Sequence, residues 1–268
     1  MTLAYPIFAE TRLSHLLRDI FRGHKVLRLS MFAMALGLAL SLVLMVFDHR
    51  LFNGVDAWDK PAKFFLSLII QMATVSWALM QMPEGVRKTR GINIAVWVMT
   101  FCAWGELLYM SYRASRGEAS HFNGSTTFAA IAYTLMGYGA VFITVSSAFV
   151  GWRVWQHRKL GMWTEAAGLG LLVGMLLGTL TGAYLGAQTS HWVGGELTDV
   201  HGVGFFGWST TGGDLRVAHF VGFHAAQVIP FAALIGNRWL VYSVALVCVL
   251  VTAGVFVMGI SGLPLFAA

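Results

Sequence analysis

Apolar residues fill seven long stretches of the chain, and short polar segments separate these stretches. The stretches cover residues 26–47, 61–82, 92–112, 127–150, 166–187, 217–235 and 239–262. Each has close to the roughly 20 residues that an α-helix needs to cross the hydrocarbon core of a bilayer. The pattern therefore predicts an all-α fold, a seven-helix transmembrane bundle that forms a single domain over residues 26–268.

Residues 1–25 have a different pattern, in which apolar and basic positions share the period of a helix. The apolar positions are Leu13, Leu16, Leu17, Ile20 and Phe21, and the basic ones are Arg12, Arg18, Arg22 and Lys25. This pattern predicts an amphipathic helix that lies on the cytoplasmic surface of the membrane. Packing of the helix against a loop or a partner protein is the alternative interpretation.

Charged residues are few and unevenly distributed. They make up 11% of the chain, against roughly 25% in soluble proteins, which indicates a polytopic membrane protein. With the N-terminus inside, 12 of the 18 Lys and Arg residues fall in inner segments, and the outer ones are Arg50, Lys60, Lys63, Arg113, Arg116 and Arg216. Cytoplasmic loops carry such an excess, so we expect a cytoplasmic N-terminus, an extracytoplasmic C-terminus and a multi-pass membrane protein. The net charge of +6 then reflects topology and does not indicate a nucleic-acid partner.

Candidate chemistry is concentrated in residues 201–230, where a Gly-rich aromatic loop leads into the sixth helix. Ionisable side chains inside a membrane are costly and usually functional. His219 and His224 are five residues apart, so on a regular helix they point about 140° away from each other. We expect His219 to face the outer loops and His224, which shares its face with Gln227, to point deeper into the bundle. His121, in the loop before the fourth helix, is expected at the same outer mouth.

These three histidines, His121, His219 and His224, are the candidate ligands of a haem or a metal ion. Glu106, in the third helix, must be protonated, paired or metal-bound, and with Asp214 it is a candidate for proton transfer or catalysis. The candidates for binding a cofactor are Lys63, Arg116, Arg216, Gly222 and Gln227. For each residue a structural role, such as a hydrogen bond or an ion pair between helices, is the alternative.

The second helix has a polar beginning. Pro61 suits the first helical turn, and Asp59 is placed to cap the helix. Lys63 points into that turn, where we expect it to bind an acidic group such as a propionate, a lipid phosphate or Glu106.

The fifth helix carries a glycine at every fourth position, at residues 170, 174, 178, 182 and 186. Small residues at this spacing allow another helix to approach closely. Tight helix packing is the structural interpretation, and a flat wall for a planar ligand is the functional one.

Three motifs resemble those of an uncharacterised family of bacterial multi-pass membrane proteins. They are WxKPxKF at residues 58–64, RGxxSHFN at 116–123 and GDLRxAHFxGxHxxQ at 213–227. The resemblance implies a bacterial inner-membrane protein with a functional core of His121, Asp214, Arg216, His219 and His224. It implies no activity, so function must be argued from the site itself.

Three hypotheses about function follow, and whether the protein is an enzyme stays open among them. The leading one is a haem b or metal protein that takes part in electron transfer or oxidoreduction, with a quinone as a possible partner. The second is a zinc-, iron- or copper-dependent membrane enzyme that acts on lipid-like substrates. The third is a transporter, sensor or assembly factor without a metal. The oligomeric state is open in all three.

Overall fold

The computed structural model describes residues 15–267, and seven of the helices in this part are long and apolar enough to cross a membrane. They are α2 (Lys25–Phe47), α3 (Asp59–Met80), α5 (Arg90–Ser115), α6 (Thr127–Gln156), α7 (Met162–Gly186), α8 (Leu215–Ala232) and α9 (Arg238–Ile260). A 3₁₀ turn, η3 (Ala233–Ile235), extends α8, so this span ends at the predicted residue 235. The prediction of an all-α fold with seven long apolar helices is confirmed, and the largest error is the end of α6, which continues six residues beyond position 150.

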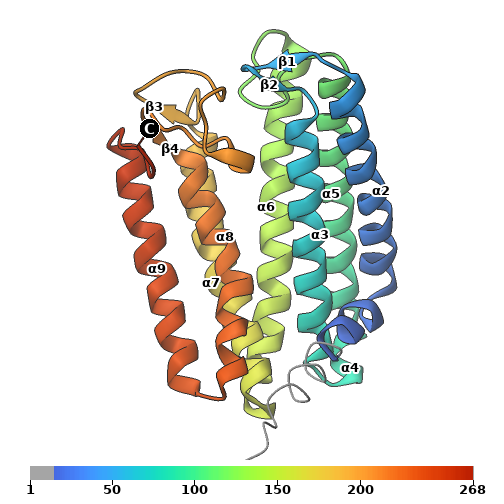
Figure 1. Cartoon of the computed structure of the whole chain (residues 1–268). Helices are drawn as coiled ribbons and strands as arrows, with labels where there is room; N and C mark the ends of the chain where they lie inside the picture. Colours follow the sequence, from blue (N-terminus) through green and yellow to red (C-terminus); the bar gives the residue numbers. More distant parts are fainter. Residues whose placement is uncertain (1–14, 268) are drawn as a thin grey trace, which may run out of the picture.

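The remaining elements are short. Near the bundle end that includes the α2–α3 connection, β1 (Leu51–Phe52) pairs with β2 (Val55–Asp56), and β3 (Trp192–Val193) pairs with β4 (Gly213–Asp214), both antiparallel (Figure 1). The long segment between α7 and α8 contains the 3₁₀ turn η2 (Gly204–Phe206). Helix α4 (Glu84–Arg87) and the turn η1 (Arg158–Leu160) lie towards the other end of the bundle.

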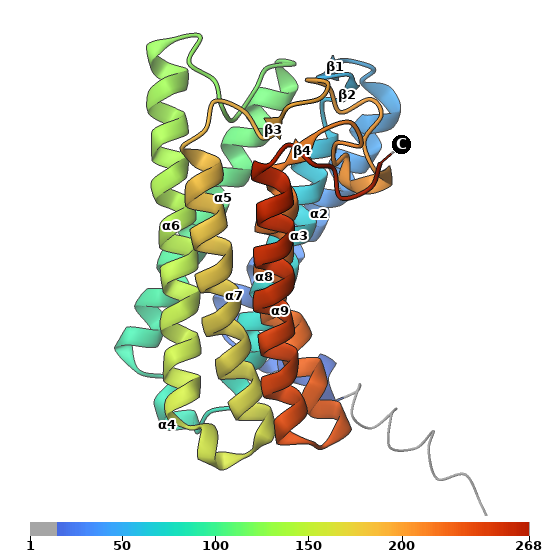
Figure 2. The ribbon, with the colours of Figure 1, turned by 90° about the vertical axis from the view of Figure 1, so that its left-hand side faces the viewer.

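The helices form two groups that share α6. Helices α2, α3 and α5 lie on one side and α7, α8 and α9 on the other, with α6 between them (Figures 1 and 2). The larger apolar core lies inside the first group and reaches α7 through Leu171 and Met175. A second core joins α7, α8 and α9 around Ile229 and Val241.

The glycines of α7 explain how closely α8 approaches it. A Cβ atom at Gly174 would lie 2.6 Å from the backbone nitrogen of Ala226, and one at Gly178 would lie 2.3 Å from the ring of Phe223. Gly222 of α8 faces the same contact, because a Cβ there would lie 3.1 Å from the Gly178 nitrogen. The structure therefore supports the interpretation of the glycine spacing as tight helix packing.

Residues 15–22 are helical and end at a break before α2. Leu16 and Ile20 pack against the larger core, and the Ser76 hydroxyl of α3 donates to the Ile20 carbonyl oxygen at 2.7 Å. This part of the expected amphipathic helix is thus packed against helices of the bundle, which differs from packing against a loop or a partner protein. Residues 1–14 lie outside the described residues, and the location of the helix at a membrane surface stays a prediction.

Candidate functional site

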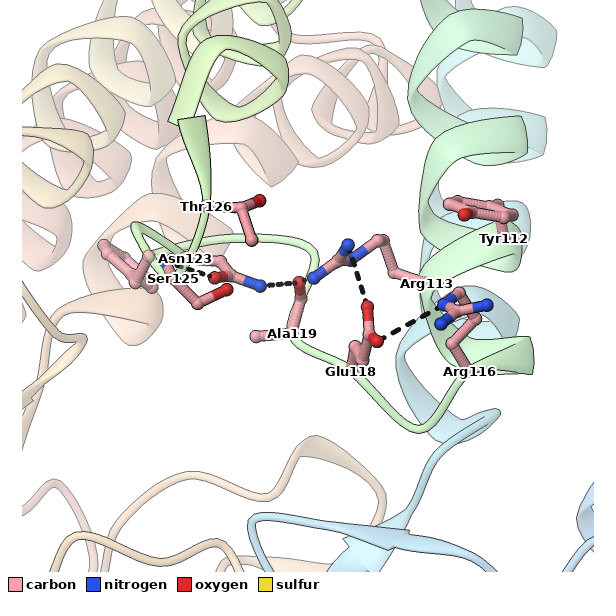
Figure 3. Close-up of a pocket in the computed structure, with 9 residues that line it drawn as sticks. Tyr112, Arg113, Arg116, Glu118, Ala119, Asn123, Ser125 and Thr126 are labelled. Atoms are coloured by element: carbon pink, nitrogen blue, oxygen red, sulfur yellow. Dashed lines mark hydrogen bonds and ion pairs between the residues drawn. The ribbon is translucent and has the colours of Figure 1, made fainter. Parts of the chain in front are cut away.

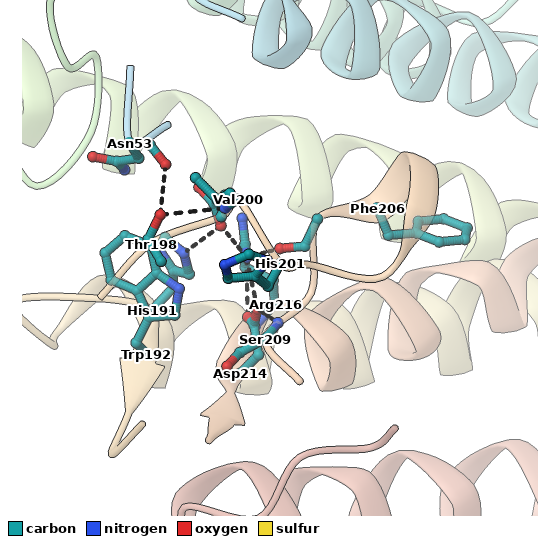
Figure 4. Close-up of polar contacts among 12 residues, drawn as sticks. Asn53, His191, Trp192, Thr198, Val200, His201, Phe206, Ser209, Asp214 and Arg216 are labelled. Carbon is teal, nitrogen blue, oxygen red and sulfur yellow. Dashed lines mark hydrogen bonds and ion pairs between the residues drawn. The ribbon is translucent and has the colours of Figure 1, made fainter. Parts of the chain in front are cut away.

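A network of buried charges ties the long α7–α8 segment to the beginning of α8 (Figure 4). The Asp214 carboxylate caps α8 by accepting from the Arg216 backbone N–H at 3.0 Å, and it also accepts from the Ser209 N–H at 3.0 Å. The Arg216 guanidinium donates to Asp214 at 2.6 Å, to Asp199 at 2.8 Å and to the Gly207 carbonyl oxygen at 2.7 Å. Asp214 and Arg216 are therefore occupied by each other and by this segment.

His191 extends this network. Its Nε2 lies 3.5 Å from Asp199 Oδ1, which is an ion-pair distance without a hydrogen bond, and its ring lies 4.0 Å from the ring of Trp192. Burial lowers the pKa of His191, although the neighbouring Asp199 opposes this shift. Burial acts to raise the pKa of Asp199, but His191 and Arg216 together hold it below its usual value. The network is thus arranged around a charged Asp199.

Lys60 is the centre of a second set of ionisable residues, which also includes Glu106 and His121. Lys60 of α3 is within electrostatic range of Glu106, Asp199 and Arg216, and its ammonium lies 5.9 Å from the centre of the Phe64 ring. No hydrogen bond or ion pair to this ammonium is found among residues 15–267. Lys60 is therefore a half-buried cation that the described residues leave without a direct anionic partner.

Glu106 of α5 is buried, and its Oε1 has no hydrogen-bond partner within the described part of the chain. Gly139 of α6 makes room for this carboxyl group, because a Cβ atom there would lie 3.0 Å from Oε1. An unsatisfied polar atom in a buried position is costly. Such an atom often marks a site of function or of a missing partner.

His121 joins this set from the α5–α6 loop. Its Nδ1 lies 3.1 Å from the Ser120 hydroxyl, and its ring packs 5.9 Å from Phe64 and 5.8 Å from Tyr133. Burial lowers its pKa well below the usual value, and the charges of Lys60 and His219 act in the same direction. His121 is consequently neutral at neutral pH and lies within electrostatic range of His219.

The two histidines of α8 each have Nδ1 occupied. Nδ1 of His219 lies 3.0 Å from the Gly178 carbonyl oxygen, and Nδ1 of His224 lies 2.8 Å from the Phe220 carbonyl oxygen. A carbonyl oxygen only accepts, so each Nδ1 carries the proton and each Nε2 keeps a free lone pair. The described residues offer no hydrogen-bond partner to either Nε2. Both rings are therefore in the tautomer that a metal ligand of this kind needs.

The expectation that His219 faces the outer loops is wrong. Its ring points towards α7, where Gly182 makes room for it, because a Cβ atom at Gly182 would lie 2.4 Å from the ring carbon Cε1. The ring of His224 instead stacks on Phe220 at 3.9 Å. The two rings thus have different neighbours, as their spacing in the sequence predicts.

The other candidate residues have partners of their own. Lys63 forms an ion pair with Asp59, so it does not bind Glu106, and Asp59 lies in the first turn of α3 without capping it. Gln227 donates to the Thr74 hydroxyl at 2.9 Å, which links α8 to α3. Arg116 is half-exposed and pairs with Glu118 at the mouth of the α5–α6 loop.

A metal site with three protein ligands does not form in this arrangement. Among residues 15–267 no group of three or more His, Cys, Asp and Glu side chains could hold a metal ion. His121, His219 and Asp214 therefore do not meet as one set of ligands, because Asp214 is held in the network with Arg216.

Three residues of these networks were not selected from the sequence as site residues: Lys60, His191 and Asp199. Lys60 is part of the WxKPxKF motif, and its i, i+3 relation to Lys63 was a signal that both lysines share a face. Segment 187–214 gave no such signal for His191 and Asp199, because it has no regular period.

The family of the three motifs stays an expectation, and the function has to follow from the geometry described above. Comparison with protein-family models, curated proteins and solved structures finds no match to this chain.

Proposed function

We propose that the protein binds haem b in the half of the bundle that contains His121 and His219, and that it takes part in electron transfer or oxidoreduction within the membrane. One observation carries this proposal. His121 and His219 lie within electrostatic range of each other, and Nδ1 of each has a hydrogen-bond partner. Beside them Lys60 offers an unpaired cation.

Haem suits this set of residues better than a bare metal ion does. Zinc sites take three or four protein ligands, and the described residues offer no group of three. Haem iron needs only one or two axial side chains, for which histidine is the usual choice. Bound haem would supply a one-electron redox couple, and a membrane quinone is a suitable partner for it.

The chain itself contributes orientation and charge. The Gly178 carbonyl oxygen fixes the tautomer and the direction of the His219 ring, as second-shell partners of ligating histidines do. The Lys60 ammonium would pair with a propionate, which would relieve the cost of a half-buried cation without a partner. His224, with the same tautomer as His219, is the remaining candidate ligand.

The test is an absorbance spectrum of the purified protein in detergent, oxidised and then reduced with dithionite. We expect a Soret band and sharp bands in the reduced state. His219→Ala should remove these bands, and His121→Ala should remove or shift them. His157→Ala is the matched control, because Nδ1 of His157 also contacts a carbonyl oxygen, that of Arg153, at 2.9 Å. Haem absorbance that is unchanged in the His121 and His219 variants would contradict the choice of ligands.

A second candidate function is favoured by Glu106. A buried carboxyl group with one unpartnered oxygen, within electrostatic range of Lys60, suits proton-coupled binding of an acidic solute. Protein that shows no haem bands, and no zinc, iron or copper by elemental analysis, would support this transporter or sensor and contradict haem. A stoichiometric metal without haem bands would instead support a metal-dependent enzyme that acts on lipid-like substrates.

A further inference from the structure

A separate depression of about 600 Å³ lies at the α5–α6 loop (Figure 3). Its lining comes from the last turn of α5, the loop and the residues that precede α6. The lining includes Tyr112, Arg113, Arg116, Glu118 and Thr126. His121, His219 and Lys60 do not belong to this lining, so the depression is a different site from the one proposed for haem.

Two arginines give the depression a positive charge. The Arg113 guanidinium is 8% exposed, donates to the Ala119 carbonyl oxygen and forms an ion pair with Glu118 at 2.8 Å. Arg116 also pairs with Glu118, at 3.3 Å through Nε. One carboxylate therefore serves two guanidinium groups, and both terminal nitrogens of Arg116 have no partner among the described residues.

The opposite wall is formed by the beginning of α6. The Thr126 hydroxyl caps this helix by accepting from the Ala129 N–H at 3.1 Å. The Asn123 side chain is fixed between the Ala119 carbonyl oxygen and the Ser125 N–H. The positive end of a 30-residue helix thus faces the same depression as two arginines, and both favour an anion.

Apolar side chains next to the depression indicate what the anion is attached to. Tyr112 in its lining is half-exposed, as aromatic residues at a membrane interface are. One turn away from the depression, Leu108 of α5 and Phe128 of α6 are 64% and 61% exposed. An anion bound here would therefore have apolar surface directly beside it, which suits acyl chains.

We propose that this depression binds the phosphate group of an anionic phospholipid. Arg116 and Arg113 hold the phosphate, the beginning of α6 adds a favourable dipole, and the acyl chains lie against α5 and α6. Arginine suits this role because its planar fork can donate two hydrogen bonds to one phosphate. In this assignment Arg116 serves a lipid and does not serve a cofactor inside the bundle.

Native mass spectrometry of the full-length protein, with phosphatidylglycerol or phosphatidylcholine added at equal concentrations, tests this proposal. We expect one phosphatidylglycerol molecule to be retained about tenfold more strongly than phosphatidylcholine, and Arg116→Gln to remove most of this difference. Arg90→Gln is the matched control, because Arg90 is an exposed arginine at the other end of the same helix. It should retain the preference. Arg116 is half-exposed, so Arg116→Gln should fold normally, which its thermal unfolding checks.

Three results would overturn the proposal. The first is an unchanged lipid preference in Arg116→Gln. The second is an equal loss in Arg90→Gln, which would indicate a general effect of charge. The third is displacement of the bound species by millimolar inorganic phosphate with no dependence on acyl chains, which would indicate a free-anion site.

Discussion

At the scale of single residues, Asp214 links the segment between α7 and α8 to the beginning of α8. It caps α8, accepts from Ser209, pairs with Arg216 and lies in β4 opposite Trp192. Its side chain is 1% exposed, so its charge depends on these contacts in place of water. Removing that charge leaves Arg216 with Asp199 alone.

We predict that Asp214→Asn lowers the free energy of unfolding by about 2–3 kcal/mol, because the variant leaves a largely buried guanidinium with one anion in place of two. Denaturant unfolding in detergent measures this change. Glu84→Gln is the control, since the Glu84–Lys88 pair is exposed on both sides, and it should leave stability unchanged. Equal stability of both variants would show that the network does not hold the α7–α8 segment.

We predict that the stability of the haem-free protein depends on pH and that part of this dependence originates from His121. Its pKa lies well below the usual value when the protein is folded and near 6.5 when it is unfolded. Below pH 6.5 the unfolded state therefore binds more protons, so stability falls as the pH is lowered, by at most about 1.4 kcal/mol per pH unit for one group. His121→Asn should reduce this slope between pH 6.5 and 5. His191 acts in the same direction, so some slope should remain, and a slope equal to that of the unaltered protein would contradict the prediction.

Sequence alone identified some of these residues and missed others for a definable reason. The spacing of Asp59 and Lys63 allowed their i, i+4 ion pair, but a cap for α3 was inferred in its place. Once that pair forms, Lys60 becomes the lysine of α3 without an anion beside it. Contacts across the bundle decide which of the two lysines, Lys60 or Lys63, has no anionic partner. The sequence pattern of one helix gives no information about these contacts.

At the scale of elements, the contact between α7 and α8 depends on the absence of side chains. Gly174 lies against the backbone of Ala226, whereas Gly186 has no atom within 4 Å of the position of a Cβ. The sequence predicted a ridge of five equivalent glycines. The structure shows that these glycines do not all lie against α8 in the same way, because the His219 ring occupies the space at Gly182 and nothing lies close to Gly186.

We predict that Gly174→Ala lowers the free energy of unfolding by about 1–3 kcal/mol, because the new methyl group meets backbone atoms that cannot move independently of their helix. Thermal or denaturant unfolding in detergent measures this. Gly186→Ala, in the same helix and in the same register, is the control and should be neutral. A neutral Gly174→Ala would mean that the two helices separate at little cost.

At the scale of the whole molecule, the seven spans could be predicted because a bilayer fixes the length of an apolar helix. The structure of segment 187–214 could not be predicted, because it rests on single contacts such as that of Arg216 with the Gly207 carbonyl oxygen. The distribution of Lys and Arg predicts a property of the whole molecule, namely which end of the bundle faces the cytoplasm.

We predict that the α6–α7 connection is cytoplasmic and that segment 187–214 lies outside the cytoplasm, because basic residues gather at the former. Labelling of Leu197→Cys and Lys159→Cys with an impermeant maleimide in intact cells measures this. Leu197 is 70% exposed and should react at once, whereas position 159 should react only after permeabilisation. If position 159 reacts at once and position 197 reacts only after permeabilisation, the predicted topology is wrong.

The contact between Arg216 and Asp199 also sets an order for biosynthesis. Segment 187–214 touches the α2–α3 connection, where the Asp199 N–H donates to the Asn53 carbonyl oxygen at 3.1 Å. Its contact with Arg216 involves a helix that the ribosome makes later. The segment can therefore complete its contacts only after α8 has been made. A nascent chain that stalls before residue 216 would expose this segment to quality-control proteases.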